Sequence, residues 1–149
     1  MGLPVQLPRK FQMTQLQLGA SGAFDVTMTP TGEPERTGCT QTGRMLLDKQ
    51  YFGDLSATGK GQMLTAFTDT KGSAAYVAIE TVSGTLAGKA GSFALQHTGS
   101  MGGGAAEQLS ISIVPDSGSG ELAGISGTMI IKREDGKHRY ELNYTLAAE

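Results

Sequence analysis

The sequence predicts an all-β protein whose single domain is a closed antiparallel eight-stranded up-and-down (meander) barrel. Hydrophobic and polar residues alternate with a period of two along many short segments, which is typical of strands with one buried face. Gly, Thr and Ser make up 49 of the 149 residues, and this composition disfavours long helices. Turn signals separate the segments at short intervals, and closing such a meander into a barrel removes both sheet edges.

The N-terminal residues 1–19 are predicted to form a leader or an extended arm, and residues 20–149 to form the barrel domain. The first 12 residues lack the apolar segment of a signal peptide. Pro4 and Pro8 favour an extended chain in this arm.

Eight segments of the barrel domain are expected to be strands. The alternation is clearest at 24–28, 108–113 and 138–146, and the Asp135-Gly136 pair is a strong hairpin signal. Residues 30–43 are expected to form a polar connection. The expected strands lie at 20–29, 43–50, 54–68, 74–84, 86–98, 107–115, 121–134 and 137–146.

A weak internal repeat supports this topology. Residues 85–93 are echoed by 121–129, and residues 54–63 form a looser copy. The glycines of the copies are expected inside equivalent strands, where they mark the bulges that a small barrel needs in order to close. A phosphate-binding loop is the weaker alternative because no stretch has the Walker spacing.

Five segments in chain order carry a resemblance to a known family: Tyr51–Leu55, Ala75–Glu80, Gly84–His97, Val114–Gly124 and His138–Tyr140. They resemble a bacterial domain family of unknown function that is grouped with the allene-oxide-cyclase-type barrels. The resemblance implies a closed antiparallel eight-stranded barrel that self-associates. It implies no reaction, because the catalytic residues of the cyclase have no motif in this sequence. The chain departs from the family pattern in having Lys89 where Arg is expected, and in lacking a Trp near the first strand.

Charge and composition exclude several classes of function. The formal net charge of −2, the pI near 5.7 and the few aromatic residues give no reason to expect nucleic acid or an anionic membrane as partner. No apolar run approaches the ~18 residues that span a bilayer. The single cysteine, Cys39, excludes an internal disulfide framework and favours a cytoplasmic location. Two histidines and one cysteine at unsuitable spacing predict no metal site, and we expect no cofactor.

His97 is the first candidate catalytic residue. It shares a strand face with Phe93 and Leu95, and an imidazole in an apolar lining can act as a general acid or base near neutral pH. The alternative is a structural histidine whose ring has one backbone partner at a barrel end.

Glu80 is the second candidate catalytic residue. If its strand face is interior, the carboxylate is desolvated and acquires a raised pKa. If that face is exterior, Glu80 belongs to a hydrated or subunit-interface patch. The exterior position is favoured because Val77 and Ile79 form the more apolar face of this strand.

Four further residues are candidates for ligand binding: Tyr76, Gln96, Glu121 and Tyr140. Tyr76 shares the face of Glu80, and adjacent antiparallel strands could group both with Gln96. Gln96 lies on the opposite strand face from His97, so the two are not expected deep in one cavity. Glu121 is expected at the start of a strand.

The leading functional hypothesis is a barrel that binds a small apolar or amphipathic molecule between Tyr, Met and Phe side chains. A cofactor-free isomerase or cyclase using His97 or Glu80 is the second hypothesis, and it depends on analogy of fold. The third is a structural or interaction module. Whether the protein is an enzyme stays open, and we expect a homo-oligomer, with a dimer favoured.

Overall fold

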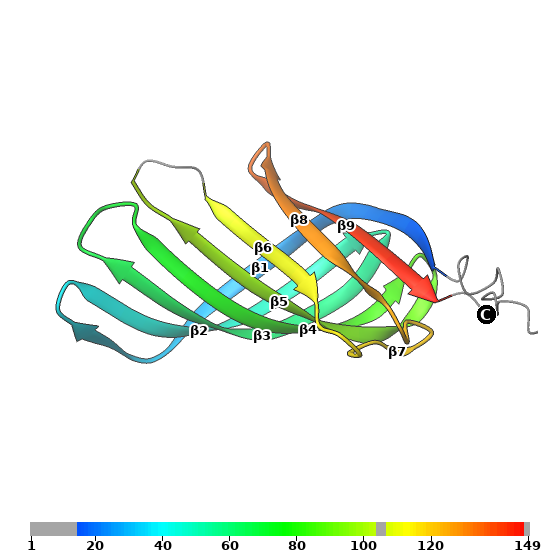
Figure 1. Ribbon diagram of the computed structural model, residues 1–149, viewed down its shortest axis with the longest axis horizontal. Helices are drawn as coiled ribbons and strands as arrows, with labels where there is room; N and C mark the ends of the chain where they lie inside the picture. The colour runs from blue at the N-terminus through cyan, green and yellow to red at the C-terminus, as the bar shows by residue number, and fades with distance from the viewer. Residues whose placement is uncertain (1–14, 104–106, 148–149) are drawn as a thin grey trace, which may run out of the picture.

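The computed structural model describes residues 15–103 and 107–147, which form an all-β antiparallel sheet (Figure 1). No helix among these residues is long and apolar enough to cross a membrane. The strands are β1 (Gln15–Thr37), β2 (Thr40–Gly53), β3 (Leu55–Thr68), β4 (Ala74–Leu86), β5 (Lys89–Met101), β6 (Gln108–Ile113), β7 (Ser119–Gly120), β8 (Ser126–Glu134) and β9 (Lys137–Ala147).

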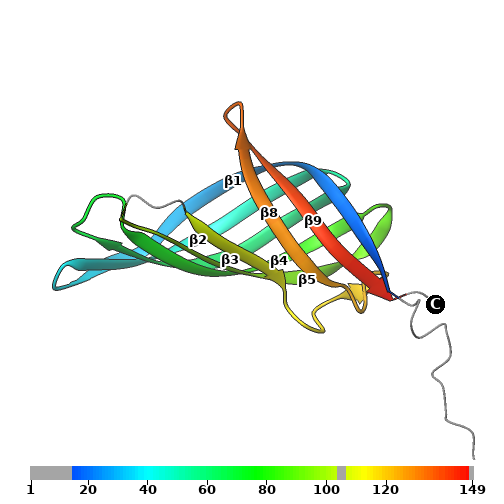
Figure 2. The ribbon, with the colours of Figure 1, turned by 45° about the horizontal axis from the view of Figure 1, so that its top comes forward.

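Eight of these strands are hydrogen-bonded into a closed ring. The strand order is β4-β3-β2-β1-β9-β8-β6-β5, and pairing of β4 with β5 closes it. Figures 1 and 2 show the long strands, tilted and curved, around a common interior. The predicted all-β antiparallel meander is therefore confirmed. The two-residue β7, which pairs with β5, was not predicted.

The first strand is longer at both ends than the sequence predicts. It begins at Gln15, which pairs with Ala147 of β9, so residues 15–19 belong to the sheet rather than to an extended arm. Residues 1–14, on which the rest of the predicted arm falls, lie outside the described residues.

The predicted connection at residues 30–43 is instead a β-hairpin. β1 and β2 continue to the pair Thr37↔Thr40, with a register shift between Thr31 and Glu35. The pairing of β1 with β9 stops at Phe24, so the rest of β1 is an edge on that side. Proline lacks an N–H group and is tolerated on such an edge, which explains how Pro30 and Pro34 fit into a strand.

The repeated glycines divide between turns and strands: Gly59, Gly61, Gly91 and Gly127 lie inside strands, as predicted, whereas Gly88 and Gly124 lie in turns. Gly88 and Gly124 have φ angles of +84° and +82° in the turns that follow Leu86 and Leu122. Glu121 likewise lies in a turn, not at the start of a strand, and β8 begins only at residue 126. A glycine in a turn supplies the positive φ that other residues adopt at a cost, and this explains Gly88 and Gly124 better than bulges do.

One end of the ring holds the hydrophobic core. Leu55, Leu86 and Phe93 are buried there with Leu122 and Ile125, which come from the segment between β6 and β8. The opposite end is formed by the β1–β2 hairpin and by the β3–β4 connection, which lie at the left of Figure 1. The described residues thus form a ring with one packed end.

Candidate functional site

Glu80 points into the ring and is fully buried, with 0% of its surface exposed. The sequence favoured an exterior position, and that expectation is wrong. Val77 and Ile79, which formed the more apolar face of the strand, are instead 48% and 54% exposed on the outside of β4. An interior carboxylate is tolerated only when donors compensate its lost hydration, and Glu80 has such donors.

Three side chains donate hydrogen bonds to the Glu80 carboxylate. Lys49 Nζ and His97 Nε2 lie 3.0 Å and 2.9 Å from Oε1, and the Tyr51 hydroxyl lies 2.5 Å from Oε2. Lys49 and His97 are 8% and 3% exposed, and Tyr51 is 0% exposed. We call these four residues the Glu80 cluster. No buried side-chain nitrogen or oxygen among the described residues lacks a partner.

Glycine at two inward positions of β3 allows the cluster to form. Lys49 of β2 pairs with Gly59, and Glu80 of β4 pairs with Gly61, so β3 runs between the two charged residues. A Cβ atom at Gly59 would lie 2.1 Å from Glu80 Oε2 and 3.1 Å from the Tyr51 ring. Because β3 presents no side chain here, Lys49 reaches Glu80 across it.

Burial and hydrogen bonding act in opposite directions on the pKa of Glu80. Desolvation, the largest single influence, raises this pKa, whereas the hydrogen bond from His97, the charge of Lys49 and the hydrogen bond from Tyr51 lower it. The donors together prevail, and the pKa lies below its ordinary value of 4.5. Since an ionised carboxylate only accepts, His97 carries a proton on Nε2. The raised pKa expected for an interior Glu80 is therefore wrong in direction.

The pKa of the Tyr51 hydroxyl is raised well above its ordinary value of 10.0, first by burial and then by the charge of Glu80 and the hydrogen bond to it. Tyr51 therefore remains neutral and donates to Glu80. The cluster combines the Lys49 ammonium, the Glu80 carboxylate, the neutral Tyr51 phenol and the His97 imidazole. These groups link β2, β4 and β5 through the interior of the ring.

The pKa of Glu80 predicts a pH dependence of stability. The unfolded chain takes up a proton near pH 4.5 and the folded chain only at lower pH, so the contribution of Glu80 is complete above that pH and is lost as pH falls through the folded pKa. We expect the difference in unfolding free energy between the wild type and Glu80→Gln to shrink as pH falls. Urea unfolding from about pH 3 to pH 7 measures this difference. Parallel curves for the two proteins would contradict the prediction.

Aromatic rings lie beside two residues of the cluster, Lys49 and Tyr51. Lys49 Nζ lies 4.9 Å from the centre of the Phe24 ring, a separation at which a cation and a ring attract. The rings of Tyr51 and Tyr140 meet edge to face at 5.6 Å. The Tyr140 hydroxyl accepts from the Leu55 N–H and donates to the Phe52 carbonyl, both at 2.8 Å. Tyr140 thus has a structural position in the core.

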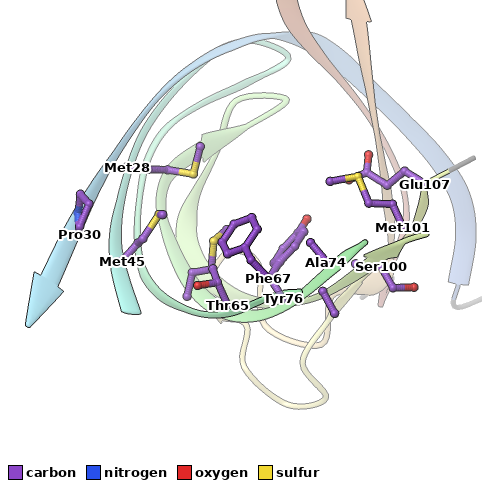
Figure 3. Close-up of a pocket in the computed structure, with 13 residues that line it drawn as sticks. Met28, Pro30, Met45, Thr65, Phe67, Ala74, Tyr76, Ser100, Met101 and Glu107 are labelled. Carbon is purple, nitrogen blue, oxygen red and sulfur yellow. The ribbon is translucent and has the colours of Figure 1, made fainter. Parts of the chain in front are cut away.

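A cavity of about 330 Å³ lies at the end of the ring opposite the core. Its lining is mostly apolar, and in Figure 3 the side chains of Met28, Met45, Phe67, Tyr76 and Met101 extend into a common space. We call it the methionine cavity. Its lining residues are Met28, Pro30, Met45, Met63, Thr65, Phe67, Ala74, Ala75, Tyr76, Gly99, Ser100, Met101 and Glu107.

The methionine cavity and the Glu80 cluster lie next to each other along the interior of the ring, and both include residues of β4 and β5. Tyr76 precedes Glu80 by two inward positions on β4, and Gly99 follows His97 by one on β5. The Tyr76 ring covers Gly99, where a Cβ atom would lie 2.4 Å from Tyr76 Cε1. None of the four cluster residues is among those that line the cavity. The buried Glu80 carboxylate therefore does not border the methionine cavity.

The structure brings together only some of the predicted site residues. Glu80 and His97 are hydrogen-bonded, and Tyr76 lies in the cavity wall. Gln96 is exposed on the outer face, as its opposition to His97 indicated, so the grouping of Gln96 with Tyr76 and Glu80 does not form. Glu121 is exposed, and its Oε1 accepts a hydrogen bond from the Ala90 N–H at 3.0 Å.

Sequence reasoning missed Lys49 and Tyr51. The predicted strand ended at residue 50, one position before Tyr51. The alternation Leu47, Lys49, Tyr51 was a signal, because residues with this spacing share a strand face and two of the three are apolar or aromatic. Among the described residues no group of three or more His, Cys, Asp or Glu side chains could hold a metal ion.

Comparison with known proteins identifies a family and a similar structure. The family model described as "Protein of unknown function (DUF3224)" matches residues 20–144. The crystal structure of a protein of unknown function from the DUF3224 family of Shewanella oneidensis MR-1 is similar, with a TM-score of 0.83 and 45% sequence identity. The match covers 88% of this chain and 98% of that chain. No curated protein matches the sequence. The predicted resemblance to a family of unknown function is confirmed, and the likeness to allene-oxide-cyclase barrels stays a prediction.

Proposed function

The chain belongs to the DUF3224 family of proteins of unknown function, and from its own geometry we propose that the methionine cavity binds a small apolar or amphipathic molecule. The observation that carries this proposal is the exposed apolar lining. Met28, Phe67 and Met101 are 50%, 48% and 44% exposed, yet they extend into one concave space (Figure 3). Apolar side chains that converge on an open cavity are typical of ligand sites.

The lining indicates the chemistry of the ligand. Four methionines, Met28, Met45, Met63 and Met101, border the cavity, and their unbranched side chains adapt to ligands of irregular shape. The volume of about 330 Å³ is at the small end of the range of pockets that hold small molecules. Polar groups are few, and the Tyr76 hydroxyl is one of them. We expect a compact ligand with a large apolar body and at most one or two polar atoms.

Architecture supports the same proposal. We interpret the closed eight-strand ring as a barrel of the allene-oxide-cyclase type, in which the interior holds one small ligand. The core fills one end of the ring, and the methionine cavity occupies the other. An isomerase or cyclase is less well supported, because both Glu80 carboxylate oxygens already accept hydrogen bonds and neither Glu80 nor His97 lines the cavity.

A fluorescence titration with the neutral apolar probe N-phenyl-1-naphthylamine tests the proposal. We expect saturable binding of one probe per chain to the wild-type protein. Met63→Gln should weaken probe binding by about tenfold, because it introduces an amide that must lose its hydration against an apolar ligand. The dissociation constant of each variant is the measurement.

Ile130→Gln is the matched control. Ile130 is 48% exposed on β8, and it is not among the residues that line the methionine cavity. Binding by this variant should equal that of the wild type. Failure of the wild type to bind in a saturable manner, or equal binding by Met63→Gln, would overturn the assignment of the site.

A further inference from the structure

The outer face of β4, β5 and β6 has no charged side chain. Every residue that alternation directs outward from these three strands is Ala, Val, Ile, Ser, Thr or Gln. The charged residues of these strands are Glu80, which points inward, and Lys89, which adjoins the β4–β5 turn. We call this outer face the uncharged wall.

Large apolar residues are exposed at the border of the uncharged wall with β2 and β3. Val77 and Ile79 of β4 are 48% and 54% exposed, Leu64 of β3 is 54% exposed, and Leu46 of β2 is 42% exposed. Leu64 pairs with Val77, while Leu46 and Ile79 both pair with Gln62. The four side chains therefore form one contiguous patch over three neighbouring strands.

The depletion of charge is local. On the other side of the ring, β8 and β9 carry Lys132, Arg139 and Glu141, and Lys132 forms an ion pair with Glu141 at 2.6 Å. The centres of protein interfaces are depleted of charge in this way, whereas ordinary surfaces are not. The uncharged wall and its apolar patch thus have the composition of an interface centre.

We propose that this patch docks against a second copy of the chain around a two-fold axis. One row of paired residues crosses β2–β5 and consists of Leu46, Gln62, Ile79 and Gln96. If the two-fold axis runs along this row, each strand lies over the same strand of the second copy and runs in the opposite direction. An interface of this kind is isologous, so each patch contacts itself. Ile79 and its counterpart meet near the centre.

Charge complementarity favours a second copy over another partner. Arg44 and Asp48 lie two residues before and two residues after Leu46, on the same outer face of β2. The proposed axis places Arg44 opposite Asp48 of the partner subunit. By symmetry the interface contains two such pairs of opposite charges. Neither residue takes part in an ion pair among the described residues. Lys60 would lie over Leu64 of the partner subunit, where its aliphatic stem can pack.

The available area suits a dimer. β4 and β5 have 13 residues each, which corresponds to a length of about 43 Å, and four strands span a width of about 19 Å. The outer face of β2–β5 therefore measures roughly 800 Å². Because this face curves with the ring, that area is an upper bound on the contact, and it reaches the area that each partner contributes to an interface of standard size.

Sedimentation velocity of the full chain up to about 100 μM tests the proposal, because mass action favours the dimer at high concentration. We expect a reversible wild-type dimer. Arg44→Asp and Asp48→Arg should each weaken it by about tenfold or more, since each brings like charges together. The double variant Arg44→Asp/Asp48→Arg restores opposite charges and should return the dissociation constant to within a few-fold of the wild type.

Two further variants place the interface. Ile79→Lys should abolish the dimer, whereas Ile130→Lys on β8, at a similarly exposed position, should leave it unchanged. A wild-type monomer throughout the concentration range would overturn the proposal and leave the patch for a different protein. A dimer that is insensitive to Ile79→Lys, or one that the double charge swap does not restore, would overturn this placement. Probe binding in the methionine cavity is a separate measurement, so either proposal can fail alone.

Discussion

Replacing Glu80 with Gln is expected to lower the free energy of unfolding by about 3–5 kcal/mol, the cost of removing one partner of a buried ion pair. The variant keeps the shape of the side chain but leaves the Lys49 ammonium buried without a counter-charge, because Lys49 is only 8% exposed. Domains of this size are stable by about 5–15 kcal/mol. The substitution therefore removes a large fraction of the stability.

Urea unfolding followed by circular dichroism measures this loss. Glu141→Gln is the control, because it breaks the Lys132–Glu141 ion pair in which both side chains are about half exposed, and pairs of this kind contribute little. Its unfolding midpoint should stay close to that of the wild type. An equal midpoint for Glu80→Gln and the wild type would show that the cluster does not stabilise the fold.

The double variant Lys49→Met/Glu80→Gln separates the lost pair from lost packing. Replacing a buried ion pair by uncharged groups of similar volume is often neutral. We therefore expect the double variant to be more stable than Glu80→Gln alone. Additive losses would instead mean that Lys49 and Glu80 act independently.

Gly59→Ala is the second substitution with a large expected effect. The new Cβ atom would lie 2.1 Å from Glu80 Oε2, and the carboxylate cannot retreat without losing a hydrogen bond from Lys49, Tyr51 or His97. Overpacking of this kind costs about 1–3 kcal/mol or more. We expect a corresponding decrease in the urea midpoint at constant slope.

Gly19→Ala is the matched control for this substitution. Gly19 also lies in a strand, but no atom lies within 4 Å of the Cβ position. Alanine there should leave the stability unchanged or raise it slightly by restricting the unfolded chain. In the Gly59→Ala background, Glu80→Asp should cost less than in the wild type because the shorter side chain makes room. A Gly59→Ala variant as stable as Gly19→Ala would contradict the close approach.

Most of the fold could be predicted, because alternation and turn residues are local signals. The antiparallel meander and most strand positions follow from them. The errors have physical causes. Pro34 indicated a loop, yet an unpaired strand edge tolerates proline. The segment around Glu121 looked like a strand, but it contains the turn with Gly124 at positive φ.

The candidate site could be predicted only in part. His97 shares its strand face with Phe93 and Leu95, and that local pattern indicated an interior side chain. Glu80 had no such pattern, because its strand is more apolar on the other face. Lys49, which donates a hydrogen bond to Glu80, lies 31 positions before it in the chain. No local signal in the sequence links these two residues. The glycines of β3 that let them meet were interpreted as part of a repeat.

By itself the sequence determined the class of fold, the chain order of the strands and which residues share a strand face, because a period of two is a property of the local backbone. It did not determine which face of β4 points inward, because a strand with period two has two equivalent sides. The tertiary structure decided this: ring closure brings Lys49, Tyr51 and His97 to Glu80 from β2 and β5. A buried carboxylate becomes stable only when such donors from distant parts of the chain replace its hydration.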